Sequence, residues 1–249
     1  MSRSRGISQL PVLSTNAWLR FDAIRRGLRT ARPNDVLEMG TGEGGLGAWL
    51  AAHYAYTGIE PDARSREVAQ ARLADVGRGR VVEGLGALGD QRFDLVCAFE
   101  VLEHIEDDVA ALEQWRDCLQ PEGWLLLSVP AHADQFGASD ELVGHFRRYE
   151  RADLTNRLEK TGHRVIRLSS YGAGLGSVLH HGRNMLARRG SAGPTAAERT
   201  SASGRYFQPH ARLAALTCAT VAAPFRLVQM PFAAGDIGTG YVVLARRSK

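Results

Sequence analysis

The segment Asp-Val-Leu-Glu-Met-Gly-Thr-Gly-Glu-Gly-Gly-Leu-Gly-Ala-Trp, residues 35–49, decides the fold. Its apolar residues from Val36 to Met39 predict a short buried strand, the glycines after them a tight turn, and residues 46–52 the start of a helix. A glycine loop before a helix N-terminus brings bare backbone amides close to a ligand, because no Cβ stands in the way. The segment therefore predicts a nucleotide-like cofactor at this turn.

The glycine spacing alone does not identify the cofactor. Gly40, Gly42 and Gly45 also match the dinucleotide pattern G-x-G-x-x-G, and Glu60 lies where a ribose-binding acid is expected. Glu38, at the end of the predicted strand, distinguishes a dinucleotide from S-adenosylmethionine as the cofactor. A buried carboxylate is costly unless it meets a cation. S-adenosylmethionine carries an ammonium group and a sulfonium, whereas a pyrophosphate carries negative charge, so Glu38 favours S-adenosylmethionine.

Three further segments follow the glycine loop in order: residues 59–62 (Ile-Glu-Pro-Asp), 93–105 (Phe-Asp-Leu-Val-Cys-Ala-Phe-Glu-Val-Leu-Glu-His-Ile) and 119–130 (Leu-Gln-Pro-Glu-Gly-Trp-Leu-Leu-Leu-Ser-Val-Pro). Together with the loop they resemble the class I S-adenosylmethionine-dependent methyltransferases, in the small-molecule branch. The resemblance covers about residues 35 to 130 at the spacing that this family uses.

The resemblance implies an α/β, Rossmann-like fold. Its sheet has seven strands, mostly parallel with an antiparallel last strand, helices on both faces, and here a helical insert between strands six and seven. Hydrophobic patterns predict strands at residues 35–39, 56–60, 80–83, 93–99, 124–129, 163–170 and 241–246. With 249 residues and 44% hydrophobic content, we expect one domain over 1–249, with a leader and an amphipathic helix in 1–32.

The resemblance also implies a set of cofactor-binding residues at the carboxyl ends of the strands. Glu60 should accept two hydrogen bonds from ribose hydroxyls. Many relatives carry an acid after the third strand that contacts adenine, but here Leu85 stands there, with Glu83 two residues earlier. The full expected set is Glu38, Gly40, Thr41, Gly42, Gly44, Glu60, Pro61, Asp62, Gly84, Leu85, Phe99, Glu100 and Val101.

Residues 131–149 are polar and aromatic without a clear helix or strand, and a loop this long in a compact domain is usually functional. We expect an active-site loop whose side chains supply a base or orient the acceptor, while Arg147 and Arg148 hold an anionic group. The alternative is that these residues fix the loop to the sheet. The catalytic candidates are His132, His145 and Tyr149 from this loop and His104 from the segment after the fourth strand.

A metal held by His132, Asp134, Asp140 and His145 is conceivable, but these residues lack a familiar ligand spacing. We therefore expect no metal site.

Residues 171–240 exceed what a turn between strands six and seven needs. The ranges 172–186 and 207–232 are apolar and helical in pattern, and predict a cap over the acceptor pocket. Alternatively the insert could form a homodimer interface or contact a membrane surface. Expected lining residues are Tyr171, His180, His181, Tyr206 and Phe207.

The charge, the cysteines and the apolar stretches of the sequence limit the partners and the location that we expect for the protein. The net charge is +4, but the arginines are scattered along the chain, so a nucleic-acid partner is not expected. The three cysteines are widely separated, which favours a reducing cytoplasm over a disulfide framework or a zinc site. The most apolar late stretch, 213–225, is too short to span a bilayer.

We therefore predict a methyltransferase that uses S-adenosylmethionine to methylate O, N or C of a small organic acceptor, such as a secondary metabolite or a quinone-like compound. Three alternatives remain open: a nucleic-acid methyltransferase, a nicotinamide-dependent oxidoreductase, and a non-catalytic interaction protein that keeps the cofactor fold.

Overall fold

The computed structural model describes residues 11, 13–189 and 212–248. The expected pocket residues Tyr206 and Phe207 lie outside the described residues.

Seven strands form one sheet in the order β3-β2-β1-β4-β5-β7-β6. Neighbouring strands from β3 to β5 are parallel, while β7 runs antiparallel to both β5 and β6. This confirms the predicted fold class. The strands are β1 Asp35–Met39, β2 Ala55–Ile59, β3 Arg80–Val82, β4 Phe93–Phe99, β5 Leu119–Pro130, β6 His163–Tyr171 and β7 Gly240–Arg247.

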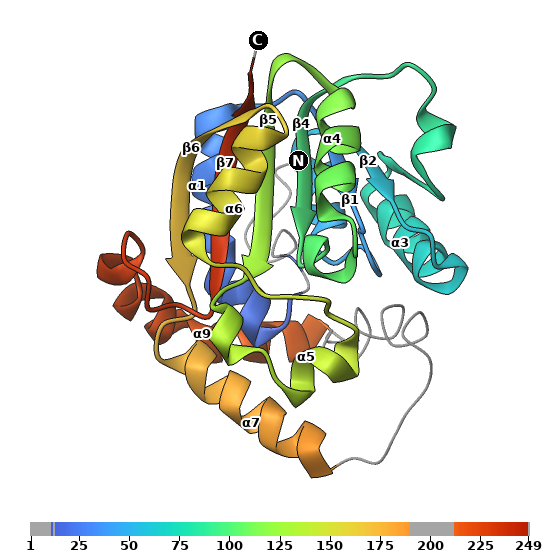
Figure 1. Cartoon of the computed structure of the whole chain (residues 1–249). Helices are drawn as coiled ribbons and strands as arrows, with labels where there is room; N and C mark the ends of the chain where they lie inside the picture. Colours follow the sequence, from blue (N-terminus) through green and yellow to red (C-terminus); the bar gives the residue numbers. More distant parts are fainter. Residues whose placement is uncertain (1–10, 12, 190–211, 249) are drawn as a thin grey trace.

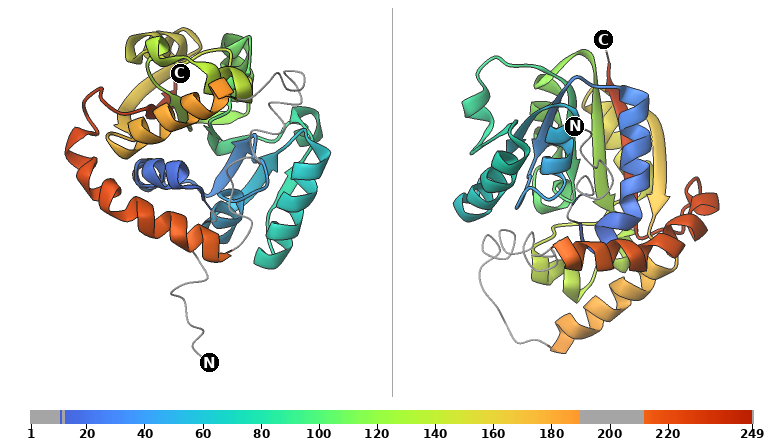
Figure 2. Two further views of the ribbon diagram at one scale, coloured as in Figure 1. Left: turned by 90° about the horizontal axis from the view of Figure 1, so that it is seen from below. Right: turned by 180° about the vertical axis from the view of Figure 1, so that it is seen from behind.

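Helices cover both faces of this sheet. On one face lie α1 Thr15–Ala31, α2 Gly47–His53 and α3 Ala63–Val76, and on the other α4 Asp108–Asp117 and α6 Arg151–Lys160. Figure 1 shows α4 and α6 in front of the strands, and the right-hand view of Figure 2 shows α1 on the opposite side. Successive strand residues alternate between the two cores: Val36 packs with the first group of helices and Leu37 with the second.

Residues 131–149 contain more regular structure than the sequence indicates. They form a short 3-10 turn, η3 Ala133–Gln135, and a helix, α5 Ala138–Val143, so the expectation of no clear element is wrong. The Asp140 side chain accepts a hydrogen bond from the Gly137 amide at 3.0 Å, and Gly144 ends the helix with φ 79°. These end contacts define α5, which is too short to show a helical hydrophobic period.

The insert is helical, as predicted. It contains α7 Leu175–Arg189, α9 Arg212–Val228 and the 3-10 turn η4 Met230–Phe232. Arg226 of α9 makes two hydrogen bonds to Asp22 of α1, at 2.8 and 2.6 Å, and the Gln229 amide donates to the Leu19 carbonyl at 2.6 Å. The α9 helix is therefore fixed to the core through α1.

The α7 helix packs against α5, where the Ser139 amide donates to the Asn184 side chain at 2.9 Å. Figure 1 shows α5, α7 and α9 beyond the arrowheads of β4 and β5, which are the carboxyl ends of these strands. Ligands of open α/β sheets bind at this edge. Among the described residues, no helix has both the length and the apolar character needed to cross a membrane.

Candidate active site

One cavity of about 480 Å³ lies at this edge, between the sheet and the helices α1, α5 and α7. It connects the glycine loop after β1 with the segment after β4 and with α5, so the cofactor and acceptor sides predicted from sequence share one space. The predicted residues that line it are Glu38, Gly40, Thr41, Gly42, Phe99, Glu100, His104, His145, Tyr171 and His180.

The glycine loop has the bare backbone that the sequence predicts. Gly40 has φ +63°, and a Cβ there would lie 2.7 Å from a methyl carbon of Val101. The next residue, Thr41, donates its amide to the Ile59 carbonyl at 2.9 Å, which ties the loop to the end of β2. Glycine is therefore required at position 40 by both conformation and space.

Among the described residues, Glu38 makes its side-chain hydrogen bonds to hydroxyl groups, and the charge of Arg20 acts on it without forming an ion pair. One of its carboxyl oxygens accepts hydrogen bonds from the Tyr56 hydroxyl at 2.6 Å and the Thr41 hydroxyl at 2.8 Å. Burial raises the pKa of Glu38 to about 7 despite these two bonds. The expectation that this buried carboxyl must have a cation is thus too strong, because hydroxyl donors and a raised pKa already accommodate it in the apoprotein.

Glu60 uses its carboxylate to hold the loop. It accepts from the Gly42 amide at 2.7 Å and from the Asp62 amide at 3.0 Å, and is 8% exposed. Burial raises its pKa, against the effect of these amides. Each carboxylate oxygen has two lone pairs, so one on each remains for ribose hydroxyls. Asp62 caps α3 by accepting from the Ser65 amide at 2.9 Å.

The remaining predicted cofactor residues do not line the cavity. Gly44 packs against Ala69 of α3, and Val101 packs over Gly40. Gly84 and Leu85 begin the turn η1 Leu85–Leu88, which follows β3. Glu83 is exposed and pairs with Arg66 at 3.9 Å. With Glu60, Pro61 and Asp62, these residues lie at the sheet edge outside the enclosed cavity.

Glu100 is held in a strained backbone conformation at the end of β4. Its φ is 59°, in the left-handed region that non-glycine residues rarely adopt. Its carboxylate accepts from Ser128 at 2.8 Å and Tyr171 at 3.0 Å, and Arg20 of α1 lies 3.7 Å away. Burial alone would raise the pKa of Glu100, but Arg20 and the two hydroxyls lower it below its usual range. Arg20 was not among the predicted site residues.

His104 and His145 stand edge to face, with ring centroids 4.6 Å apart. His104 comes from the 3-10 turn η2 Leu102–His104 and His145 from the segment after α5. The Nδ1 atom of His104 lies 3.3 Å from the Gly144 carbonyl. A carbonyl can only accept, so Nδ1 carries the proton and Nε2 keeps its lone pair. Burial, with His145 nearby, lowers the pKa of His104 to about 4, so its ring is neutral at neutral pH.

The structure does not bring the other two catalytic candidates to the cavity. Tyr149 is 0% exposed in the core under α4, and its hydroxyl donates to Asp108 at 2.9 Å. His132 lies 2.9 Å through Nε2 from the Gly238 carbonyl, at the start of β7. Neither lines the cavity. Both fix the 131–149 segment to the sheet, which was the alternative interpretation.

The arginines predicted to hold an acceptor anion are already paired with protein groups. Arg147 contacts Asp108 at 2.8 Å, while Arg148 contacts both oxygens of Asp140 at 3.0 Å and His180 at 2.9 Å. His181 is exposed and bonds within α7. Arg147 and His181 are absent from the cavity lining, whereas Arg148 reaches it with its charge compensated.

Of the metal ligands considered from sequence, Asp140 and His145 are bonded to each other at 2.8 Å, while His132 and Asp134 cluster with Glu150. The four residues therefore do not converge on one site in the described structure. Glu103, which the sequence analysis left without a role, lies beside His104 and His145 instead.

A family model described as a methyltransferase domain matches residues 19–168, more than half of the chain. A protein of Mycolicibacterium smegmatis described as an S-adenosylmethionine-dependent methyltransferase is 31% identical over 69% of this chain and 70% of its own length. A ubiquinone biosynthesis O-methyltransferase of Nitrosospira multiformis is 34% identical, over 44% of this chain and 48% of its own length. The chain thus matches about half the length of that relative.

The crystal structure of the [4+2]-cyclase SpnF superposes with a TM-score of 0.54 at 19% identity, covering 91% of this chain and 81% of that one. Likeness at this level of identity shows the fold alone.

Proposed function

We propose that the chain, which belongs to the methyltransferase-domain family, is an S-adenosylmethionine-dependent methyltransferase of small molecules, and that its acceptor is a hydroxylated, quinone-like compound methylated on oxygen. The observation that carries the proposal is the single cavity that joins the glycine loop to His104 and His145. The ubiquinone biosynthesis O-methyltransferases among the relatives support an oxygen acceptor.

The residues present fit the cofactor. Gly40, Thr41 and Gly42 form part of the cavity wall, with no side chain on the two glycines, and the buried Glu38 lines the same cavity. Glu38 would meet the ammonium group, Glu60 the ribose, and Phe99 with Glu100 the methionine part. When bound, S-adenosylmethionine supplies an activated methyl group on its sulfonium. The protein then has to align the acceptor oxygen and exclude water, which can contribute several kcal/mol without a covalent intermediate.

His104 is placed to orient the acceptor. Its Nε2 lone pair lies in the cavity lining, and a neutral imidazole accepts a hydrogen bond from a hydroxyl. With a pKa of about 4 the ring is a weak base, so we assign it an orienting role instead of full proton removal. Tyr171 and Arg20, which both contact Glu100, also line this cavity.

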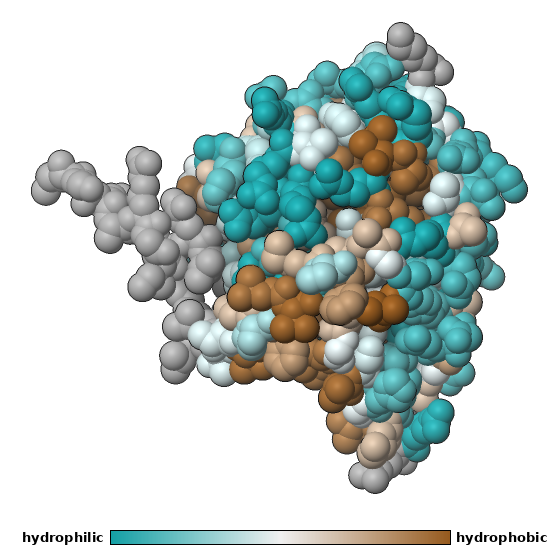
Figure 3. Space-filling view, turned by 90° about the vertical axis from the view of Figure 1, so that its left-hand side faces the viewer, coloured by the Kyte–Doolittle hydropathy of each residue, from teal (hydrophilic) through white to brown (hydrophobic). Residues whose placement is uncertain are grey.

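The insert supports a role as a cap, because α7 supplies His180 to the cavity wall and packs on α5. Its outer surface is apolar: Figure 3 shows apolar side chains gathered on this side of the molecule. Exposed apolar residues of the insert include Val178 and Met185 on α7 and Leu227 and Val228 on α9. We propose that two copies of the chain can form a homodimer through this apolar surface of the insert. The three free cysteines support the proposed cytoplasmic location.

Calorimetry with S-adenosylmethionine tests the proposal. We expect micromolar binding, and a loss of about tenfold or more in Glu60→Ala, because this carboxylate orders the loop and holds the ribose. Glu83→Ala is the matched control, since Glu83 is exposed at the same edge. Transfer of a labelled methyl group to a panel of catechols and hydroquinones then identifies the acceptor. Absence of cofactor binding to the wild-type protein would overturn the assignment.

A further inference from the structure

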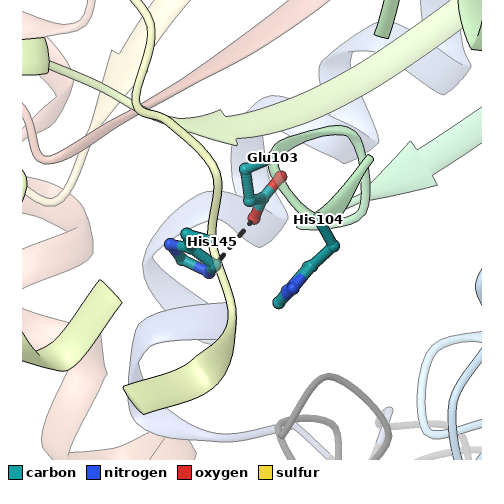
Figure 4. Close-up of side chains that lie close together, drawn as sticks. All are labelled: Glu103, His104 and His145. Carbon is teal, nitrogen blue, oxygen red and sulfur yellow. Dashed lines mark ion pairs between the residues drawn. The ribbon is translucent and has the colours of Figure 1, made fainter. Parts of the chain in front are cut away.

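Glu103, His104 and His145 form a cluster whose ligand atoms all lie within 4.8 Å of one another. Figure 4 shows the three side chains, with the Glu103 carboxylate directed at the His145 ring. Glu103 and His104 belong to η2 after β4, whereas His145 follows α5, so the cluster joins two segments that are distant in sequence. Both histidines line the cavity described above.

Glu103 lacks what a buried carboxyl needs. It is 0% exposed, and within the described part of the chain neither of its side-chain oxygens has a hydrogen-bond partner. Its nearest ion-pair contact, His145 Nε2, is 3.8 Å away, beyond hydrogen-bond distance. Leaving a buried acceptor unsatisfied costs about 1–3 kcal/mol. The carboxyl is therefore incomplete without a further group beside it.

The two histidines present lone pairs to the cluster. His145 Nδ1 lies 2.8 Å from Asp140, and His104 Nδ1 lies 3.3 Å from the Gly144 carbonyl. Both partners accept hydrogen bonds, so both Nδ1 atoms carry protons and both Nε2 atoms are free to bind. Metal-bound histidines are oriented by such outer contacts. Arg148 in turn holds Asp140 with two bonds of 3.0 Å.

The separations allow a common ion. Three donors bound to one cation at about 2.1 Å stand about 3.4 Å apart, so the donor separations, at most 4.8 Å, need to shorten by no more than about 1.4 Å. A second cluster, His132 with Asp134 and Glu150, is less suited. Its two acids are exposed, His132 Nε2 already contacts the Gly238 carbonyl, and Glu150 accepts from the Ala133 amide at 2.7 Å.

We propose that Glu103, His104 and His145 bind one divalent transition cation, and that its open coordination positions bind the hydroxyl oxygen of the acceptor. Two imidazoles and one carboxylate suit Zn²⁺ and its first-row neighbours better than Mg²⁺, and three protein ligands leave positions open. The second half of this inference rests on the proposed function, because it assumes a hydroxyl acceptor. The ion would hold the acceptor oxygen at the wall of the cavity where His104 and His145 meet. With the ion bound, His104 would orient the hydroxyl through the ion and not through a direct hydrogen bond.

The binding half is tested by titrating the full chain, stripped with a chelator, with Zn²⁺ in a calorimeter and with Co²⁺ by visible absorption. We expect one ion per chain, and Glu103→Gln and His145→Gln should each weaken binding about tenfold or more. The matched control Glu150→Gln belongs to the other cluster and should bind as the wild type does. S-adenosylmethionine affinity checks that each variant is folded. The site would be ruled out if the wild type bound no ion, or if Glu103→Gln and His145→Gln both bound the ion as tightly as the wild type does.

The acceptor half is tested by methyl transfer to the best acceptor of the panel. Chelator treatment should reduce turnover about tenfold or more, with recovery on adding Zn²⁺ or Co²⁺, while cofactor affinity stays within about twofold. If turnover is unchanged after the chelator has removed the metal, the proposal that the ion binds the acceptor oxygen is wrong. If no acceptor is methylated in any condition, the proposed function fails, but the Zn²⁺ titration still decides whether the cluster binds metal.

Discussion

Glu38 and Glu103 are two buried carboxyl groups at the same edge of the sheet, exposed by 4% and 0%, and their surroundings differ. Glu38 accepts hydrogen bonds from Tyr56 and Thr41, whereas neither oxygen of Glu103 has a hydrogen-bond partner. Burial raises the pKa of both groups, to about 7 for Glu38 and well above the usual range for Glu103, where the charge of Glu100 adds to the effect. The comparison indicates that the protein itself supplies hydrogen-bond donors to Glu38, on the proposed cofactor side, while Glu103, on the proposed acceptor side, lacks one among the described residues.

The largest expected effect is that Glu103→Leu and Glu38→Leu change the free energy of unfolding in opposite directions. A pH of about 5.5 with chelator favours the neutral form of both carboxyls, because burial raises the pKa of each, and their hydrogen bonds are then the main difference. Glu103→Leu should raise the free energy of unfolding by about 1–3 kcal/mol, because it removes an unsatisfied polar group. Glu38→Leu should lower it by about 1–2 kcal/mol, because it deprives two buried hydroxyls of their acceptor. Urea denaturation measures both, and equal signs would break the comparison.

The next effect is the pH dependence of cofactor binding. Below its pKa of about 7, Glu38 is protonated and cannot pair with an ammonium group. The affinity for S-adenosylmethionine should therefore fall as the pH drops, by about tenfold from pH 8 to pH 6. In Glu38→Gln the affinity for S-adenosylmethionine should be weaker and should no longer change with pH over this range. Calorimetry at a series of pH values checks this, and an unchanged profile in the variant would show that another group titrates.

The smallest effect concerns the hydroxyl that supports Glu38. Tyr56→Phe removes a hydrogen bond of 2.6 Å that favours the charged carboxylate, so the pKa of Glu38 should rise further. Cofactor affinity at neutral pH should fall about threefold to tenfold, and the midpoint of its pH profile should move upward. Tyr54→Phe, the neighbouring tyrosine outside this cluster, is the control. A midpoint that stays in place would mean that Tyr56 only packs against the core.

Much of the fold was readable from the sequence. Each predicted strand lies within a few residues of an observed one, except that β5 begins five residues earlier, at Leu119, where it pairs with Phe93. Continuous apolar runs bounded by glycines are typical of strands that are covered by helices on both faces. The chain has such runs, so its strands could be predicted. The α5 helix was missed because contacts at its ends define it, through Asp140 and Gly144.

The candidate site was readable only in part. Glu38, Gly40 and Glu100 were found because they sit in contiguous segments at the ends of strands, where local order predicts position. Tyr149 and His132 were chosen by residue type, and the fold uses them to anchor their segment. Arg20 and Tyr56 were missed, since each meets its carboxylate from a different element of the chain.

The sequence by itself determined the order of the strands along the chain, the glycine loop and the methyltransferase family, because each depends on residues close together in the chain. Only the tertiary structure decided which side chains meet in the cavity: that Glu38 is satisfied by hydroxyls, and that Glu103 lies beside His145 with no hydrogen bond to its oxygens. The hydrogen bonds and the burial of these carboxyls depend on side chains from distant parts of the sequence that meet at the edge of the sheet. Their meeting follows from the packing of the whole chain, and no local sequence pattern encodes it.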